Sequence, residues 1–450
     1  MGERQSKALA YVIAVDMGYG HERAAFALRH LGPKKTYIVA NNYEGIPDKE
    51  KRLWTTGRGL YEAVSRFKRV PIFGSLAFKV MDELQEIPPF YPRRDLSRPS
   101  LQVRQTYALV RNQHLCEHLI QTLAKKPLPL VCTFFTPAFA AEELGYPGDI
   151  YLVICDADVA RAWVPIAPKK SRIKYFAPTG RVAERLRLYG VRPENIFLTG
   201  FPMPVDNIGG LDAELVEADI HRRMCKLDPE GVFAARAQKL LAAKFGKTFC
   251  NFDSSQYRKP PSITFAVGGA GAQREMIGLA LRSLAQHIRK GSLVVNLVAG
   301  THKDAAEYFE REIRLNGLVG MRNKGVSILF EKTRLDYFTS FAKLMRETDI
   351  LWTKPSELSF TTGLGIPIIM APTVGSQEDF NRKWLIQTGG GIDALEPQYM
   401  DEWLFDWIKS GALARMAWNG YTNAPTHGAY RIEGILRGES VNIPALPLVV

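Results

Sequence analysis

The chain has 450 residues, of which 46% are hydrophobic and 23% are charged. This length exceeds what one hydrophobic core usually serves, so we expect two domains, and the composition excludes a disordered chain. No apolar run reaches the roughly 20 residues that span a bilayer. The opening stretch "MGERQSKALAYVIAVDMG" has neither the apolar region nor the small-residue cleavage site of a signal peptide, so we expect a cytoplasmic protein.

The five cysteines are scattered and none falls in a CxxC pair, which predicts neither a disulfide framework nor a zinc site and favours a reducing compartment. Lys and Arg number 59 against 46 Asp and Glu, a formal net charge of +13 that favours anionic partners. The basic residues are dispersed, and no RRM, zinc-finger or helix-turn-helix pattern accompanies them. We therefore expect no nucleic-acid partner.

Residues 1–205 alternate apolar strands with helical patterns, as expected for a parallel sheet covered by helices on both faces. In chain order, the predicted strands are "YVIAVDMG" (11–18), "KTYIVANN" (35–42), "PLVCTFF" (129–135), "IYLVICD" (150–156), "IKYFAPT" (173–179) and "IFLTGFP" (196–202). We predict a helix from about residue 21 and another over 180–190. These elements form one doubly wound α/β domain, the N-terminal acceptor-side domain.

Residues 70–125 interrupt this alternation. The stretch "VPIFGSLAFKVMDELQEIPPFYPRR" (70–94) is amphipathic, rich in Phe and Pro, and ends in arginines. We predict two packed helices and a loop here. The alternative is a lid or acceptor-side surface that touches lipid, which predicts weak peripheral association with an anionic membrane at its inner face.

Residues 206–260 are polar and helical in pattern, and we interpret them as an insertion or linker. A second α/β series follows over 261–400, with strands at "ITFAV" (263–267), "SLVVNLVAGTH" (292–302), "VSILFEK" (326–332), "DILWTKP" (349–355) and "PIIMAP" (367–372). Residues 401–450 are predicted as helices that pack back towards the N-terminal domain. The fold class is therefore α/β, with two Rossmann-like doubly wound domains that face a cleft.

Each half opens with a strand, a glycine cluster and a helix: "DMGYGHERAA" (16–25) and "VGGAGAQREM" (267–276). Glycines let the backbone approach a ligand closely, and a helix N-terminus offers free N–H groups and a positive dipole to phosphate. Neither cluster is GxGxxG, and no acidic residue for a dinucleotide ribose is evident, so a nicotinamide enzyme is disfavoured. Two clusters in matched positions indicate ligand binding rather than two tight turns.

At these positions the sequence resembles the family-28-type glycosyltransferases. "GYGHERAA" (18–25) is similar to their GGGHxxAA segment, "YFAPTGRVAERLRLYGVRPENIFLTGFPMP" (175–204) to the end of their N-terminal domain, and "DILWTKPSELSFTTGLGIPIIMAPTVGSQEDFN" (349–381) to their donor block. The group includes monogalactosyldiacylglycerol synthases and the N-acetylglucosaminyltransferase of peptidoglycan synthesis. The resemblance implies the two-domain fold called GT-B and sugar transfer from a nucleotide donor, usually UDP-linked, without a required metal.

Sugar transfer needs a base for the acceptor hydroxyl group and positive or dipolar groups for the leaving diphosphate. His21, predicted at the first helix N-terminus, is the candidate base, and Asp156, at a strand end, is the second catalytic candidate. Tyr19 replaces a glycine of the family pattern and is expected to shape the acceptor site. The remaining acceptor-side candidates are Gly18, Gly20 and Asp158. Asp156 and Asp158 form an Asp-x-Asp pair, but we expect no metal.

The donor-binding candidates belong to the second half. The glycine cluster is expected to hold the diphosphate through backbone N–H groups, Lys354 and Ser356 to reach phosphate or ribose, and Gln377 and Glu378 to match the hydroxyl groups of the sugar. Thr362 stands where the family has a ribose-binding Glu, and Glu357 is the nearby carboxylate. The full donor set is Gly268, Gly269, Gly271, Ala272, Gln273, Thr301, Lys354, Ser356, Glu357, Thr362, Gln377 and Glu378.

We therefore predict a glycosyltransferase of the hexosyl or N-acetylhexosaminyl class that inverts the anomeric carbon. The nucleotide sugar is a co-substrate and no cofactor is expected; the acceptor is open, a lipid among the candidates. One alternative is an enzyme like UDP-N-acetylglucosamine 2-epimerase, which shares the fold and needs carboxylates and basic groups at the sugar. Another is a non-catalytic nucleotide-sugar-binding protein on the same fold. Much of this rests on fold-level analogy.

Overall fold

The computed structural model describes residues 8–55, 87–246, 259–266, 274–373 and 375–441. The chain divides into two compact units. Unit 1 comprises Met1–Met203, Gly375–Phe380 and His427–Val450, and unit 2 comprises Pro204–Val374 and Asn381–Thr426. The first boundary lies close to the one expected at residue 205. The predicted donor glycine cluster (267–273) and most of the segment 70–94 lie outside the described residues.

The described residues of unit 1 contain six parallel strands in the order β2-β1-β3-β4-β5-β6. The strands are β1 (Tyr11–Ala14), β2 (Ile38–Val39), β3 (Leu130–Cys132), β4 (Ile150–Val153), β5 (Lys174–Ala177) and β6 (Ile196–Leu198). The helices are α1 (Tyr19–Leu28), α4 (Leu101–Gln113), α5 (Glu117–Ala124), α6 (Phe135–Glu143), α7 (Gly180–Leu188) and α16 (Gly428–Leu436), and residues 48–55 are also helical. Short 3-10 helices are η1 (Arg29–Leu31), η2 (Pro33–Lys35), η3 (Arg161–Trp163) and η4 (Pro193–Asn195).

The described residues of unit 2 also contain six parallel strands, in the order β12-β11-β10-β7-β8-β9. The strands are β7 (Ser262–Ala266), β8 (Val294–Gly300), β9 (Val326–Phe330), β10 (Ile350–Thr353), β11 (Ile368–Met370) and β12 (Gly391–Asp393). The helices are α8 (Glu214–Lys226), α9 (Val232–Phe245), α10 (Arg274–Arg289), α11 (Lys303–Leu315), α12 (Arg334–Glu347), α13 (Ser376–Thr388), α14 (Met400–Lys409) and α15 (Ala412–Asn423). Short 3-10 helices are η5 (Val205–Asn207), η7 (Val319–Met321), η8 (Glu357–Leu364) and η9 (Pro397–Tyr399).

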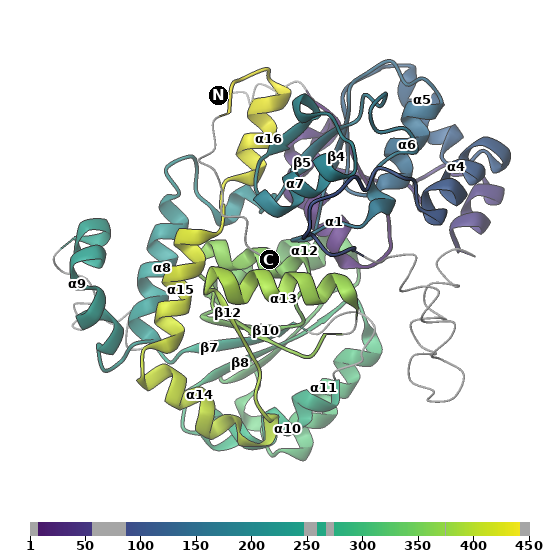
Figure 1. Cartoon of the computed structure of the whole chain (residues 1–450). Coiled ribbons are helices and arrows are strands. Elements are labelled where there is room, and N and C mark those ends of the chain that lie inside the picture. Colours follow the sequence, from purple (N-terminus) through teal and green to yellow (C-terminus); the bar gives the residue numbers. More distant parts are fainter. Residues whose placement is uncertain (1–7, 56–86, 247–258, 267–273, 374, 442–450) are drawn as a thin grey trace, which may run out of the picture. The chain divides into compact units, whose positions relative to one another are not determined.

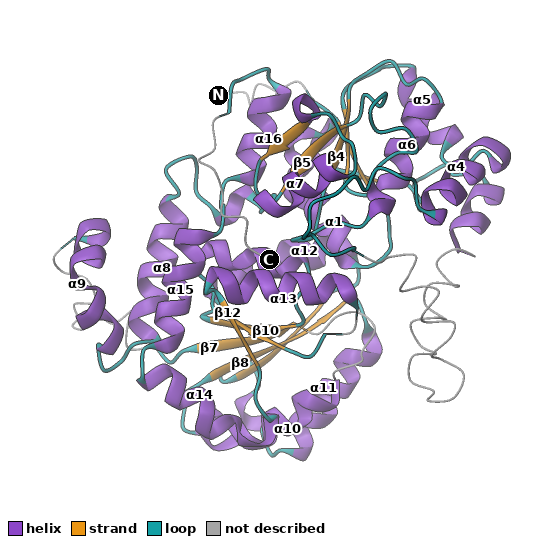
Figure 2. Cartoon of the chain, viewed as in Figure 1, coloured by secondary structure: helices purple, strands orange, loops and turns teal. Residues whose placement is uncertain are grey.

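The apolar strands are buried because helices cover both faces of each sheet. All four residues of β4 and all five of β7 are buried. In unit 2, α10 and α11 lie on one side of the strands and α12 on the other (Figure 1). The strands are enclosed by helices in each unit (Figure 2). The predicted class of two Rossmann-like α/β domains is therefore confirmed, each with its own buried apolar cluster.

The helices outside the two predicted α/β series each belong to one of the two units. Helices α8 and α9, from the predicted insertion 206–260, belong to unit 2. Of the C-terminal helices, α14 and α15 belong to unit 2 and α16 to unit 1. In unit 1, α4 and α5 fill the interruption before β3 and contribute Val103, Tyr107 and Leu119 to the core.

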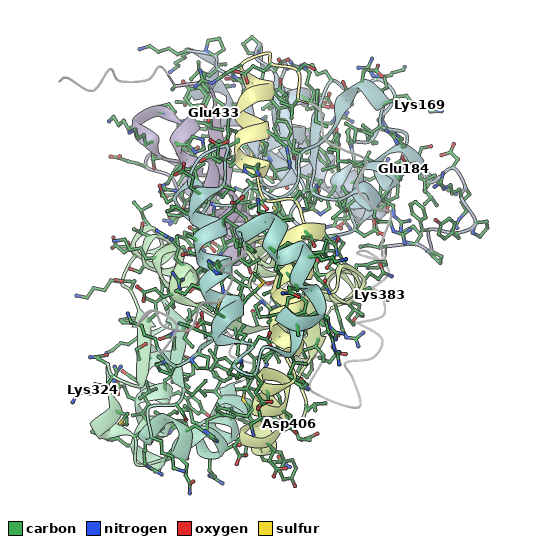
Figure 3. All side chains as sticks on the ribbon, turned by 90° about the vertical axis from the view of Figure 1, so that its left-hand side faces the viewer. Lys169, Glu184, Lys324, Lys383, Asp406 and Glu433 are labelled. Atoms are coloured by element: carbon green, nitrogen blue, oxygen red, sulfur yellow. The ribbon has the colours of Figure 1, made fainter. Side chains whose placement is uncertain are left out.

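The cysteines depart in one place from expectation. Cys116, Cys132 and Cys155 are free and buried, but Cys225 on α8 is disulfide-bonded, so the expectation that disulfides are absent does not hold there. Within the described ranges no helix is long and apolar enough to cross a membrane. Charged side chains are exposed at the surface of the units, as at Lys169, Lys324 and Asp406 (Figure 3).

Candidate functional site

In both sheets, the chain adds its first strands on one side of the first strand and then continues on the other side; this is the switch point of the topology. In unit 1, β2 is added on one side of β1 and β3 on the other; in unit 2, β8 is added on one side of β7 and β10 on the other. The connections that follow the two central strands then run to opposite faces of the sheet, and we call the region beyond the carboxyl ends of these two strands the crevice of the unit. Ligands of open parallel sheets bind at this place. The crevice therefore lies between β1 and β3 in unit 1 and between β7 and β10 in unit 2.

Glycine at position 18 fits the turn between β1 and α1. The φ angle of Gly18 is 114° with ψ 178°, a conformation that side chains rarely adopt. A Cβ atom there would meet no atom within 4 Å, so the backbone conformation, rather than crowding, favours glycine. The turn starts α1 at Tyr19 and places His21 in its first turn. The sequence-based placement of His21 at a helix N-terminus is therefore confirmed.

The end of β3 holds the backbone of His21. The Thr133 hydroxyl group donates a hydrogen bond to the carbonyl oxygen of His21 at 2.8 Å, and the Thr133 N–H group donates to the carbonyl oxygen of Ile13 at 2.9 Å. One residue thus joins both sides of the crevice. Thr133 was not among the sequence-predicted residues, although a polar residue directly after an apolar strand is a usable signal.

The imidazole of His21 lies among aromatic side chains. Its ring centroid is 5.0 Å from that of Phe134, edge to face, and 5.6 Å from that of Trp163. Phe135 stacks on Phe134 at 4.4 Å and meets Trp163 at 5.4 Å. Trp163 and Phe135 are buried, whereas His21 is half-buried. The arrangement presents an imidazole on an apolar wall at the crevice of unit 1.

The two acidic residues after β4 have different surroundings. Asp156 is half-buried. Asp158 is fully buried, and its two carboxylate oxygens accept hydrogen bonds from Nε and Nη2 of Arg185 at 2.9 and 2.8 Å. Asp158 is thus held in a buried ion pair, and its acceptor-side role stays a prediction. Asp156 stays a candidate.

In unit 2, three candidates follow β10. Lys354, Ser356 and Glu357 are half-buried on the turn that leads into η8. The hydroxyl group of Thr353 donates to the carbonyl oxygen of Ala266 at 2.8 Å, which joins the ends of β10 and β7 at the crevice. Thr301 and His302 are half-buried after β8, where His302 precedes the first turn of α11.

A buried arginine of α8 fixes the elements beside this turn. The Arg223 side chain is 1% exposed and donates to the carbonyl oxygens of Thr348, Leu364 and Gly365 at 2.8, 2.9 and 3.0 Å. These carbonyl groups precede β10 and lie at the end of η8. Arg223 thus braces both flanks of the segment that carries Lys354, Ser356 and Glu357.

The other donor candidates are placed differently. Thr362 is fully buried, its hydroxyl group donates to the carbonyl oxygen of Gly390 at 3.3 Å, and a Cβ atom at Gly390 or Gly420 would collide with it. Thr362 is thus packed against two glycines, and its donor role stays a prediction. Gln377 and Glu378 are half-buried in the first turn of α13, within the residues grouped with unit 1. The candidates Gly268, Gly269, Gly271, Ala272 and Gln273 lie outside the described residues.

Within the described ranges, no three His, Cys, Asp or Glu side chains gather as a metal site would require. Metal independence stays a prediction. Peripheral membrane association also stays a prediction, since most of the segment 70–94 is outside the described residues. In its described part, Phe90 is 6% exposed and Tyr91 is 62% exposed.

No protein-family model matches the sequence. No curated protein matches it either. Similar solved structures include MnaA from S. aureus with UDP, at 13% identity and a TM-score of 0.47, covering 97% of this chain and 99% of that chain. MurG from Acinetobacter baumannii has 13% identity and a TM-score of 0.46, with 95% and 99% covered. UDP-GlcNAc 2-epimerase from Neisseria meningitidis bound to UDP-GlcNAc has 14% identity and a TM-score of 0.44, with 75% and 82% covered. At these values the likeness says nothing further about the chemistry of this chain.

Proposed function

We propose that this protein is a glycosyltransferase that moves a sugar from a nucleotide donor, UDP-linked, to the hydroxyl group of an acceptor. The observation that carries the proposal is the half-buried imidazole of His21, held on an aromatic wall at the crevice of unit 1. An imidazole takes up a proton near neutral pH, and aromatic faces suit the apolar faces of a sugar or a lipid-linked acceptor.

The proposed reaction has one displacement step. The acceptor hydroxyl group loses its proton to the His21 imidazole, and its oxygen bonds to the anomeric carbon of the donor. The bond from that carbon to the diphosphate oxygen breaks, and the electron pair leaves with the diphosphate. Attack from the side opposite the leaving group inverts the anomeric carbon. Asp156 is the alternative base, because it is half-buried after β4 of the same sheet.

We assign donor binding to the crevice of unit 2. Lys354 supplies a positive charge to the diphosphate, and Ser356 and Glu357 offer a hydroxyl group and a carboxylate to the ribose. Thr301 lies beyond the neighbouring β8 strand. The support is their common position at the carboxyl end of one sheet, at its switch point.

A 2-epimerase is the second candidate, because unit 1 also offers half-buried acidic groups at Asp16 and Asp156 beside β1 and β4. Such an enzyme eliminates and re-adds the nucleotide and needs no acceptor. The two reactions therefore differ in their substrates.

The test has two stages. Thermal-shift screening against UDP, GDP, TDP and CDP sugars identifies the donor, because a ligand that binds only the folded state raises its stability. The identified donor is then incubated with and without acceptor pools, and the products are resolved by mass spectrometry. We expect nucleoside diphosphate release that depends on an acceptor. Epimerised donor without an acceptor would establish the 2-epimerase instead, and binding without turnover would leave a non-catalytic protein.

A further inference from the structure

Three arginine side chains surround one phenylalanine ring in unit 1. The guanidinium carbons of Arg181, Arg185 and Arg93 lie 4.0, 5.1 and 5.6 Å from the ring centroid of Phe90. Arg181 and Arg185 belong to α7, whereas Arg93 and Phe90 belong to the segment that precedes α4. We call these three arginines the guanidinium cluster.

The cluster has more positive charge than its described surroundings neutralise. Arg185 is satisfied in part by Asp158, through the two hydrogen bonds described above. Glu184, the next acidic residue on α7, pairs with Arg187 instead. Among the described residues, Asp158 pairs with Arg185, and no carboxylate forms an ion pair with Arg181 or Arg93. An additional anion would restore the balance.

Arg181 is the member that most needs a partner. Its side chain is 6% exposed, and its Nε and Nη1 atoms are buried without a hydrogen-bond partner among the described residues. Nη1 of Arg185 is also buried without a hydrogen-bond partner among the described residues. Burial lowers the pKa of the Arg181 guanidinium group, whereas Asp158 raises it. Burying N–H groups without hydrogen-bond partners costs free energy. Contact with the Phe90 ring offsets only part of that cost, because a ring face does not replace the missing hydrogen bonds.

The N-terminus of α7 adds to the same place. Thr179 caps the helix by accepting a hydrogen bond from the N–H group of Val182 at 3.1 Å. The N–H groups of Gly180 and Arg181, also in the first turn, have no partner within the helix because of their position. A helix N-terminus favours an anion through these groups and its dipole. Both backbone and side chain of Arg181 are therefore suited to one anion.

We propose that the guanidinium cluster and the first turn of α7 bind the phosphate group of a ligand. A phosphate dianion matches the excess of two positive charges, and its several oxygens can accept from more than one guanidinium group. The exposed side chain of Arg93 extends the cluster to the surface. The cluster consists of other residues than His21, Phe134 and Trp163, and the proposal does not depend on the glycosyltransferase activity.

The test is isothermal titration calorimetry of the full chain with inorganic phosphate at constant ionic strength. We expect wild-type protein to bind phosphate, and Arg181→Met, which keeps a long apolar stem on Phe90, to lose about 10- to 100-fold in affinity. Arg187→Met is the matched control, because Arg187 lies on the same helix but pairs with Glu184 at the surface. Its phosphate affinity should equal that of wild type.

A second variant keeps the test decisive if Arg181→Met does not fold. Arg93 is exposed, so Arg93→Gln should fold as wild type and still weaken phosphate binding several-fold. Vesicles of phosphatidylcholine with phosphatidic acid identify the source of the phosphate: flotation lost in Arg93→Gln indicates a lipid headgroup, and phosphate binding without flotation indicates a soluble phosphate. The proposal is overturned if wild-type protein binds no phosphate, or if Arg93→Gln and Arg181→Met bind it as well as wild type.

Discussion

Unit 1 and unit 2 share a parallel α/β plan, but their crevices carry different side chains. In unit 1 the crevice is lined by Phe134 and Trp163 around one imidazole. In unit 2 it is flanked by the hydroxyl group of Ser356 and the charged groups of Lys354 and Glu357. An apolar wall lowers the local dielectric around a base, whereas charged and hydroxyl groups match the oxygens of a nucleotide. In the proposed function, one fold used twice therefore divides proton transfer, in unit 1, from nucleotide binding, in unit 2.

The first prediction concerns the imidazole of unit 1. His21→Ala should lower turnover by about 10²–10⁴, the usual contribution of a positioned acid or base, and leave the affinity for UDP unchanged. Steady-state kinetics and calorimetric UDP titration measure the two effects. His30→Ala is the control, because His30 interacts with Glu433 at 3.2 Å, on α16, and not with the aromatic wall. Wild-type turnover in His21→Ala would leave His21 as a packing residue and favour Asp156.

The second prediction tests whether Asp158 serves stability or the acceptor side. Asp158→Asn leaves the guanidinium group of Arg185 buried without its counter-charge, which should cost about 3–5 kcal/mol of the free energy of unfolding. Glu184→Gln, at the surface pair with Arg187, should cost no more than about 1 kcal/mol. Urea unfolding compares the two variants. Should Asp158→Asn unfold like wild type but lose turnover, Asp158 would be an acceptor-side residue after all.

The third prediction concerns the charge of unit 2. Lys354→Met should weaken UDP binding by about 10- to 100-fold, since it removes a charged hydrogen-bond donor to the diphosphate. Lys324→Met, at an exposed position before β9, is the control and should bind UDP normally. Calorimetric titration measures both. Equal affinities of the two variants would remove Lys354 from the donor site.

The fourth and smallest prediction contrasts two buried carboxylates. Asp349 of unit 2 is paired with Lys226 at 2.8 Å, whereas Glu50 of unit 1 is 5% exposed and accepts a hydrogen bond from the Cys116 N–H group at 3.1 Å. Burial raises the pKa of the Glu50 carboxyl group from its ordinary value of 4.5 to about 7. Between pH 4.5 and about 7, the folded state therefore holds the proton of the Glu50 carboxyl group more tightly than the unfolded state does.

Stability should therefore fall as the pH rises from about 4.5 to about 7, by about 1–3 kcal/mol for this group. Glu50→Gln, which has no proton to lose, should reduce that fall. Denaturant unfolding at pH 4.5, 6 and 7.5 measures the difference between variant and wild type. An identical pH dependence in both proteins would show that the Glu50 carboxyl group titrates normally in the folded state.

Local pattern predicted most of the strands, because a buried parallel strand is a short apolar run whatever its partners. Strand β12 (Gly391–Asp393) was missed, since it has three residues and follows two further glycines. The order of strands in each sheet was not predictable in this way, because pairing such as β7 with β10 joins residues far apart in the sequence.

The candidate site residues also fall into two groups, those whose position follows from a local feature and those whose burial depends on tertiary contacts. The position of His21 followed from the glycine turn, a local feature. The burial of Asp158 did not, because it depends on Arg185, 27 residues later in the chain. Thr362 likewise owes its burial to the approach of Gly390 and Gly420, which no local pattern around residue 362 records. The burial of a residue that depends on tertiary contacts could not be predicted from local pattern, whereas positions set by strand ends and helix starts could.

The central claim is that the nucleotide binds at the crevice of unit 2 and not at that of unit 1. Backbone hydrogen exchange with and without saturating UDP tests it most directly, since a bound ligand slows local opening where it binds. We predict slower exchange after β8 (residues 301–303) and after β10 (354–362), and unchanged exchange at 18–22 and 133–136. Protection confined to 18–22 and 133–136 would contradict the claim.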